Sequence, residues 1–384
     1  MTHRVEVRPQ MFEWARIRAR LDIADLVGRF PRLADWEAGR AMPTFRQLEN
    51  YAAATHAPLG FFLLPEPPAE PVPIPDFRTM LGRPVTAPSA NLLDTIYLCE
   101  ARQDWYRDHA RAARENPLMF VGSVRVGADV VATAVTIGAT ITFDLDARRR
   151  AHAWEDALRT FIQQAEDAGV LVMRSGIVGN NTHRPLDPDE FRGFALADPL
   201  APVVFVNGAD TKSGQMFTLA HELVHIWCGQ TALSDEDPRF LDVTDTEAWC
   251  NAVAAELLVP HASMREAFEG TSPLADETRR LARRFKVSTL VILRRIFDIG
   301  GLSRNAFWRA YEAELERLRA IGDQGAGGGN FHLTEAARVS RRFAQALVSS
   351  TLEGQTLYRD AFRMLGISKM ETFRDFGQTI GVAV

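Results

Sequence analysis

The sequence predicts an α+β fold that is mostly helical, with helical units toward both ends and a small sheet in the middle. Apolar residues recur at helical spacing through most of the 384 residues. Short apolar runs suited to strands lie between residues 170 and 207. The last of these runs leads directly into another apolar helical pattern, so this sheet and this helix are expected to belong to one domain.

Residues 1–64 are predicted to form a small helical unit with tight turns. Helices are expected over residues 9–19 and 23–29. Gly39 fits the end of a further helix, and Pro43 fits the start of the next one. Successive short helices of this kind are compatible with a helix-turn-helix unit.

Two interpretations of this first unit stay open: it binds DNA, or it docks onto a protein as a helical bundle. It contains nine Arg and seven Asp or Glu residues, a net charge of +2 (9 − 7), which is small for phosphate binding. The side chains predicted to contact DNA or a partner are Arg29, Arg32, Arg40 and Arg46.

A proline-rich segment, residues 65–90, is predicted to be a linker. Eight prolines lie between residues 65 and 88. This composition favours an extended, semi-rigid chain on the surface. A spacer is the preferred interpretation, and a docking motif for a partner is the alternative.

Residues 91–321 are expected to form one domain with a helical lead-in. Helical patterns and strand patterns both occur there. The predicted helices before the central motif cover residues 91–116, 127–138 and 152–169, and the predicted strands cover residues 170–173, 193–197 and 203–207. The helices expected near the end of this domain cover residues 276–285, 288–300 and 308–320, the last with an exposed, charged face.

The helix that follows the last strand carries His221, Glu222 and His225 among apolar residues. Two His residues four apart lie on one face, one turn apart, so both can bind a single metal ion. Glu222 lies beside them, where it can act on the water that completes the coordination sphere. Two core His residues with ordinary hydrogen bonds are the alternative. The expected ends of this helix are Thr211 or Ser213 and Gly229.

A catalytic zinc site needs a third protein ligand, and the predicted helix that ends at Pro260 offers Glu247 and Glu256. Nine residues apart, these acids lie on opposite sides of a helix, so only one can face the metal. Glu247 is predicted to be the ligand, because the first turn lies nearer the open edge of a site. Asn251, one turn further, is predicted to support it.

The three Cys residues have no paired spacing, which is typical of a reducing cytoplasm. Cys228 is an alternative metal ligand, although a buried Cys more often acts as a small apolar residue. The net charge of −5 and the pI near 6.0 argue against an affinity of the whole molecule for nucleic acid or anionic membranes. No signal-peptide core and no run of about 18 apolar residues occurs, so a cytoplasmic protein without membrane contact is expected.

The strand of residues 203–207 is predicted to border the site. A strand directly before the His-containing helix can form a sheet edge, and an extended peptide can pair with such an edge. Phe205, Val206 and Asn207 are therefore predicted to line a peptide groove. An interior strand is the alternative.

The end of the chain is predicted to contain a flexible hinge and a helical unit. Residues 322–330 contain five Gly in nine residues, which is typical of a hinge. Residues 331–384 have helical patterns and a nearly balanced charge that indicates no particular partner.

Two motifs resemble known families. The run Phe217-Thr-Leu-Ala-His-Glu-Leu-Val-His, followed by Glu247-x2-Cys-Asn251-x2-Ala-Ala-Glu-Leu-Leu-Val-Pro260, resembles the ImmA/IrrE family of bacterial metallo-endopeptidases. The arrangement Trp36-Glu37-x-Gly39-x3-Pro43-Thr44 resembles helix-turn-helix repressors of the XRE family. Together the resemblances cover about residues 1–310.

The resemblance implies a zincin-like metallopeptidase domain that holds Zn²⁺, with Mn²⁺ as an alternative. Carried over by position, the metal ligands are His221, His225 and Glu247, and the catalytic acid is Glu222. The implied substrate is an XRE-type transcriptional repressor, whose cleavage relieves repression in a stress, DNA-damage, mobile-element or toxin–antitoxin circuit.

Three features stay undecided at the level of sequence. An oxyanion stabiliser is needed, and His183 and His261 are candidates because they lie in loops flanking the motif; an exposed loop His is the alternative. The alternative function is a DNA-binding regulator whose metallopeptidase-like domain senses a signal without turnover. The sequence also leaves open a homo-oligomer.

Overall fold

The computed structural model of the chain describes residues 4–75, 87–234, 245–322 and 338–383. Contacts divide the chain into two compact units, Met1–Pro73 with Pro84–Tyr97, and Ile74–Arg83 with Leu98–Val384. The centre of the predicted linker, residues 76–86, lies outside the described residues, as does the predicted hinge beyond Gly322.

The first unit is built around a cluster of aromatic rings. Phe12, Trp36, Tyr51 and Phe62 are at most 2% exposed. The Tyr51 hydroxyl donates a hydrogen bond to the Phe12 carbonyl at 2.8 Å, which satisfies a polar group inside the core. The elements of this unit are α1 (Pro9–Arg18), α2 (Ile23–Val27), α3 (Leu33–Glu37), α4 (Phe45–Ala54) and the 3-10 helix η1 (Leu59–Leu63).

The second unit contains a four-stranded sheet in the order β1-β3-β2-β4. β1 (Leu171–Ser175) is parallel to β3 (Val203–Asn207). β2 (Gly193–Leu196) is antiparallel to both β3 and β4 (Ala232–Ser234). The predicted α+β fold, mostly helical with a small sheet, is confirmed. β4 was not predicted, because three residues are too few to show an alternating pattern.

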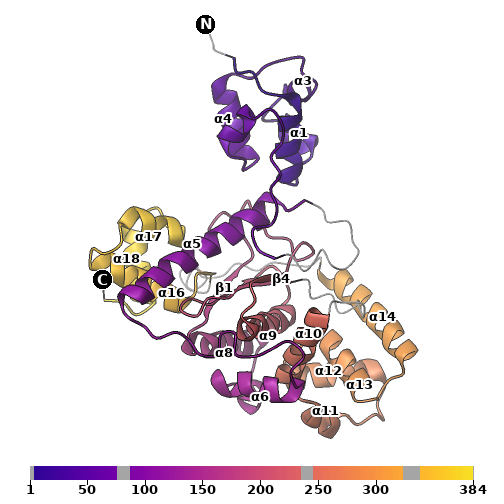
Figure 1. Cartoon of the computed structure of the whole chain (residues 1–384). Helices are drawn as coiled ribbons and strands as arrows, with labels where there is room; N and C mark the ends of the chain where they lie inside the picture. The colour runs from indigo at the N-terminus through magenta and orange to yellow at the C-terminus, as the bar shows by residue number, and fades with distance from the viewer. Residues whose placement is uncertain (1–3, 76–86, 235–244, 323–337, 384) are drawn as a thin grey trace. The chain divides into compact units, whose positions relative to one another are not determined.

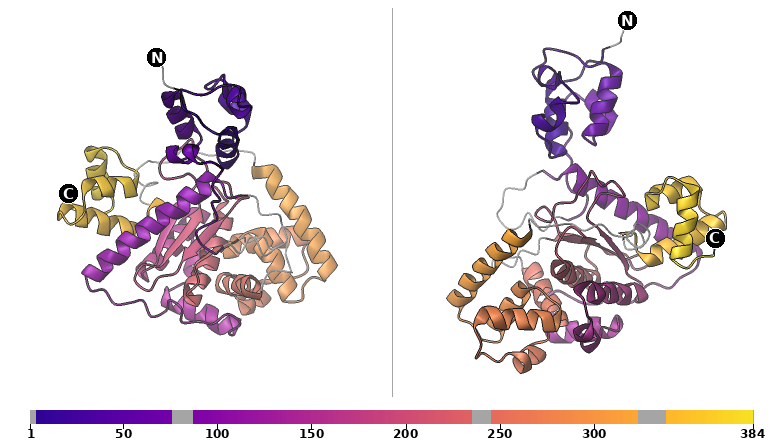
Figure 2. Two further views of the ribbon diagram at one scale, coloured as in Figure 1. Left: turned by 45° about the horizontal axis from the view of Figure 1, so that its top comes forward. Right: turned by 180° about the vertical axis from the view of Figure 1, so that it is seen from behind.

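The sheet separates two apolar layers, because successive strand residues point to opposite faces. On one face, Val172 and Val204 belong to the same core cluster as residues of α8 (Trp154–Asp167) and α9 (Lys212–Cys228). On the other face, Met173 of β1 contacts Cys99 of α5 (Ala90–Ala112), with their sulfur atoms 3.7 Å apart. Figure 1 and the left view of Figure 2 show the part of α5 that belongs to this unit, from residue 98 on, along the sheet on the side opposite α8 and α9.

The helices that follow β4 continue the α9 side of this core. α10 (Asp245–Leu258) packs along α9, and α6 packs on α10. Phe307 and Tyr311 of α14 (Arg304–Gly322) are buried with Leu293, so this helix has a packed side besides the exposed, charged face that was predicted. The other helices of this region are α6 (Val130–Thr140), α7 (Leu145–Arg150), α11 (His261–Ala267), α12 (Leu274–Phe285), α13 (Thr289–Asp298) and α14 (Arg304–Gly322).

Both ends of α9 are fixed by local hydrogen bonds. The Thr211 hydroxyl accepts from the Gly214 N–H at 3.1 Å, and Gly229 ends the helix in a left-handed conformation with φ of 67°. The N–H groups of Gly122 and Val124 bind the last carbonyls of α9. These contacts confirm the predicted helix ends and leave little freedom for the side chains that α9 carries.

The C-terminal helices pack on the second unit. The Arg102 guanidinium of α5 donates two hydrogen bonds, at 2.7 and 3.0 Å, to the carbonyl of Met364. Asn180, in the loop after β1, donates to the carbonyls of Leu365 and Gly366. These helices are α16 (Arg341–Leu352), α17 (Tyr358–Leu365) and α18 (Met370–Thr379). Within the described residues, no helix has the length and apolar character that a membrane span requires.

One end of the proline-rich segment lies against the sheet. The backbone N–H of Leu233 in β4 donates to the Pro75 carbonyl at 2.9 Å, and Ile74 is only 6% exposed. This part of the predicted linker is therefore not a freely solvated spacer: its backbone satisfies a donor at the edge of β4.

Candidate metal centre and its surroundings

Three side chains with metal-binding atoms meet between α9 and α10. The Nε2 atoms of His221 and His225 are 3.0 Å apart. The Glu247 carboxylate oxygens lie 3.1 Å from the first of these atoms and 3.2 Å from the second. All three side chains are at most 2% exposed. In the part of the chain that the structure describes, this is the one group of three or more His, Cys, Asp or Glu residues with such convergent ligand atoms.

The spacing of these atoms fits a tetrahedral metal ion. Zinc bonds of about 2.0–2.1 Å place neighbouring ligand atoms about 3.3 Å apart. The separations between His221, His225 and Glu247 are 3.0, 3.1 and 3.2 Å. Two imidazoles and one carboxylate leave a fourth position open, as catalytic zinc sites do. The residues therefore fit zinc, and this mixed set of nitrogen and oxygen donors also suits manganese.

The electrostatics of the site favour a carboxylate at Glu247. Burial opposes its ionisation most strongly, but the charge of His221 and the hydrogen bonds from both imidazoles outweigh burial and hold the pKa of Glu247 below its usual range. Burial likewise holds the pKa of His225 below its usual value. A neutral imidazole next to an ionised carboxylate is the protonation state that a metal ion requires.

Glu222 lies where α9 approaches the sheet most closely. A Cβ atom on Gly193 of β2 would meet the Thr218 methyl carbon at 2.4 Å, the Phe205 carbonyl oxygen at 2.8 Å and the Glu222 Cγ at 3.3 Å. Only glycine fits between these atoms. The closeness of β2 and α9 therefore fixes Glu222, which is 0% exposed, directly beside the two His ligands.

Comparisons with known proteins agree with this geometry. Residues 165–297 match the family model of the IrrE N-terminal-like domain, a range that begins in α8 and includes the sheet, α9 and α10. The chain carries an ImmA/IrrE-type domain. A segment of 101 residues, 24% of this chain, is 32% identical to the radiation response metalloprotease IrrE of Deinococcus radiodurans and spans 29% of that protein. Residues 339–379, which hold α16 to α18, match a model described as a domain of unknown function (DUF8813).

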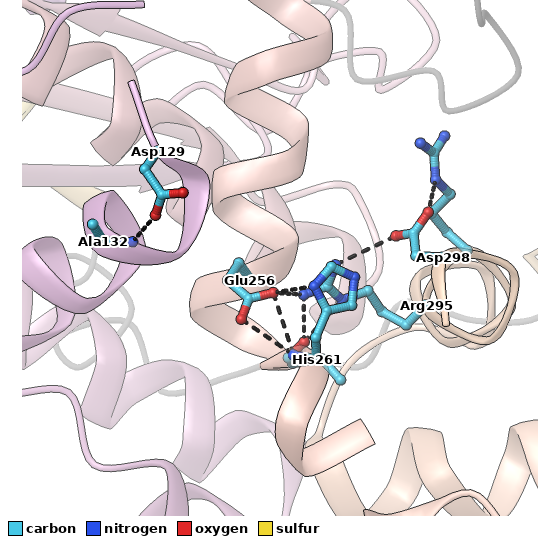
Figure 3. Close-up of polar contacts among 8 residues, drawn as sticks. Asp129, Ala132, Glu256, His261, Arg295 and Asp298 are labelled. Atoms are coloured by element: carbon cyan, nitrogen blue, oxygen red, sulfur yellow. Dashed lines mark hydrogen bonds and ion pairs between the residues drawn. The ribbon is translucent and has the colours of Figure 1, made fainter. Parts of the chain in front are cut away.

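Glu256, the alternative third ligand, has a different role in the IrrE-like domain. Its carboxylate lies 3.0 Å from Nδ1 of His261 and accepts a hydrogen bond from Arg295. Arg295 also donates to Asp298 at 3.3 Å. Figure 3 shows these four side chains gathered between α10, α11 and α13. Glu256 therefore neutralises a buried guanidinium, which is only 2% exposed, and does not join the metal ligands.

Neither His residue predicted to stabilise an oxyanion is brought to the ligands. His261 follows the end of α10 and is held by Glu256, which itself lies about 13 Å along the helix from Glu247. Burial and Arg295 keep the pKa of His261 below its usual value. His183 is exposed in the loop after β1, next to the segment that binds the C-terminal helices. Sequence proximity to the motif did not translate into spatial proximity.

The predicted peptide groove along residues 205–207 was wrong. β3 pairs with β1 on one side and β2 on the other, so it has no free edge. Phe205, Val206 and Asn207 are at most 2% exposed. Asn207 instead fixes the turn before α9: it donates to the Phe191 carbonyl and accepts from the Ala209 N–H, both at 3.0 Å.

The sequence did not reveal the cavity beside the site. This cavity has a volume of about 560 Å³ and lies between α6, α9, α10 and α13. Phe217 and Asn251, each one turn from a metal ligand, line it. The Oδ1 atom of Asn251 makes no hydrogen bond within the described parts of the chain, so the predicted support of Glu247 by Asn251 is not seen. Its lining comes from α6, α9, α10 and α13, with His261 of α11 and Arg192 before β2, and only tertiary packing brings these residues together.

Cys228, the alternative ligand, lies outside the metal cluster. A hydrogen bond joins its thiol to that of Cys250 on α10 and lowers the pKa of Cys228. Both Cys residues lie three positions after a metal ligand, on the sides of α9 and α10 that face each other. They therefore serve as contacts between the two helices.

The four Arg residues predicted to contact DNA or a partner are exposed around α3 and α4 of the first unit. Asp35 pairs with two of them, at 3.0 Å to Arg40 and 3.9 Å to Arg32. The other two residues are Arg29 and Arg46. The acidic neighbour reduces the positive charge that α3 presents to a phosphate backbone.

Proposed function

We propose that the IrrE-like domain is a zinc-dependent endopeptidase. The observation that carries this proposal is the convergence of His221, His225 and Glu247, with the buried Glu222 beside them. The similarity to a protein described as a metalloprotease supports it. Mn²⁺ is the alternative ion. The chain spans 29% of that relative, so the proposal rests mainly on the geometry of the site.

In the proposed mechanism, Glu222 is the general base and then the general acid. Zinc bound by the three ligands would polarise a peptide carbonyl and make water more acidic. Glu222 takes the proton from the attacking water and delivers it to the leaving amine. Because the Glu222 side chain is buried and its Cγ lies against β2, no large movement of this side chain competes with the proton transfer.

The first test compares wild-type protein with Glu222→Gln, both loaded with zinc or manganese. Glutamine keeps the shape of the side chain but cannot accept the proton, so we expect unchanged metal content and a loss of cleavage of about 100-fold or more. Metal content is measured by mass spectrometry and cleavage on gels. Equal cleavage by the variant would reject Glu222 as the base.

We further propose that the substrate is an XRE-type transcriptional repressor whose cleavage relieves repression in a stress, DNA-damage or mobile-element circuit. The family resemblance of the motifs and the description of the relative as a radiation response metalloprotease support this substrate. The test is incubation of the metal-loaded protein with the XRE-type repressor encoded beside it. An intact repressor under conditions where other peptides are cut would exclude it.

For residues 1–64 we propose docking onto a protein partner rather than DNA. The pairing of Asp35 with two Arg residues weakens a DNA surface, whereas Phe45 and Met42 expose 51% and 48% of their areas. Copurification of the repressor that depends on residues 1–64 would support docking. A salt-sensitive electrophoretic shift with the protein's own upstream DNA would instead favour the regulator alternative.

A further inference from the structure

The cavity is lined by residues that neighbour the proposed metal ligands in α9 and α10. Phe217 lies one turn before His221, and the centroids of these two rings are 6.5 Å apart. Ala248 directly follows the ligand Glu247, and it lines the same cavity as Phe217. In a peptide bound at the metal, the side chain next to the scissile bond would therefore enter this cavity.

Much of the cavity wall is apolar. The wall is formed mainly by α6, α9, α10 and α13, and Asp129 fixes the start of α6 by accepting from the Ala132 N–H at 2.7 Å (Figure 3). The volume of about 560 Å³ exceeds that of any one side chain. The apolar residues that line the cavity include Val130, Phe217, Ala252, Leu290 and Val291.

The charged groups at the α13 end satisfy one another. Asp298 accepts from Arg294 at 2.9 Å and from Arg295 at 3.3 Å. Arg295 is also bound by Glu256 and donates to the Val259 carbonyl. Two guanidinium groups thus face two carboxylates, so this end offers no excess charge to a ligand. Arg192, which also lines the cavity, takes part in an interaction with another part of the chain. Selection in the cavity therefore depends on shape and apolar contact.

We infer that this cavity is the specificity pocket of the proposed peptidase and takes a large apolar side chain, such as Leu, Met or Phe, next to the scissile bond. The inference rests on the proposed function, because the same site supplies the metal. Asn251 accepts an N–H of the peptide backbone with its Oδ1 atom, which makes no hydrogen bond within the described residues. Side-chain selection and backbone anchoring are thus assigned to different residues.

The first measurement is cleavage of a proteome-derived peptide library by the full-length zinc-loaded protein, read by mass spectrometry. We expect wild-type protein to favour a large apolar residue at one position flanking the cut. Ala252→Phe fills the pocket, so cleavage of those sites should fall by roughly 10–200-fold, while sites with Gly or Ala there persist. Ala112→Phe, at an exposed position of α5, is the matched control and should keep the wild-type preference.

The second measurement is binding without cleavage. Fluorescent decapeptides of Gly and Ser with a central Leu or a central Ala are titrated against zinc-loaded Glu222→Gln protein. The Leu peptide should bind more tightly, and adding Ala252→Phe should remove the difference. Asn251→Ala should weaken both peptides by the same factor of roughly 2–10, because it removes a backbone contact. If Ala252→Phe fails to fold by circular dichroism, Leu290→Trp fills the pocket from α13.

The outcomes separate the inference from the proposed function. If no peptide is cleaved but the Leu peptide binds selectively and Ala252→Phe removes this selectivity, the peptidase activity is rejected and the specificity pocket is supported. If peptides are cleaved and neither the sequence preference nor the binding changes in Ala252→Phe and Leu290→Trp, the peptidase activity is supported and the specificity pocket is rejected. Cleavage without preference for a large apolar residue also overturns it.

Discussion

At the scale of single residues, the two acids of α10 show how environment assigns different roles to the same side chain. Glu247 lies between two imidazoles, whereas Glu256 lies against the buried Arg295. Their separation of nine residues puts them on opposite sides of the helix. One carboxylate is therefore available to a metal and the other is committed to an ion pair.

This division predicts opposite effects for two matched substitutions. Glu247→Gln removes a charged ligand, so zinc affinity should fall by at least 10-fold. The free energy of unfolding without metal should change little or rise, because a buried charge is removed. Glu256→Gln should keep zinc binding but cost about 3 kcal/mol, because it removes the shorter of the two described carboxylate contacts of a buried guanidinium and leaves the one to Asp298 at 3.3 Å. Chelator competition and urea unfolding measure the two effects. Equal zinc affinities in the two variants would contradict the assignment of Glu247.

At the scale of elements, the contact between β2 and α9 controls the position of Glu222, the proposed catalytic acid. Gly193→Ala places a methyl group 2.8 Å from the Phe205 carbonyl and 3.3 Å from the Glu222 Cγ. We expect a loss of about 1–3 kcal/mol in stability from overpacking and a larger loss of turnover than of metal binding. Gly28→Ala is the control, because nothing lies within 4 Å of its Cβ.

Helix patterns predicted the elements that carry the ligands, whereas pairing partners could not be predicted. The sequence could predict the three proposed ligands because helical spacing and helix faces depend only on nearby residues; these ligands are His221, His225 and Glu247. β3 was expected at an edge because it leads directly into α9, but its two pairing partners, β1 and β2, are set by contacts between strands that local patterns do not show. The cavity could not be predicted either, because the helices that form its walls are brought together by long-range packing.

At the scale of the whole molecule, attachment of the C-terminal helices depends on pH through Glu166 of α8. Ser340, which caps α16, and the N–H groups of Arg341 and Arg342 donate to this carboxylate. Burial outweighs these bonds and raises the pKa of Glu166 from 4.5 to about 7. The folded state binds the Glu166 proton more tightly than the unfolded state does. This proton's contribution to stability is therefore complete below pH 4.5 and is lost as the pH rises through 7.

The loss corresponds to about 3 kcal/mol between pH 5 and 8, because a change of one in pKa equals about 1.4 kcal/mol. Glu166→Gln stays neutral at every pH and still accepts a hydrogen bond, so we expect it to protect α16 more than wild type does at pH 8 and equally at pH 5. Hydrogen exchange of residues 341–352, compared between the two proteins at each pH, measures this protection. If the variant protects α16 less at pH 8, the ionised carboxylate holds the helices together and the burial argument fails.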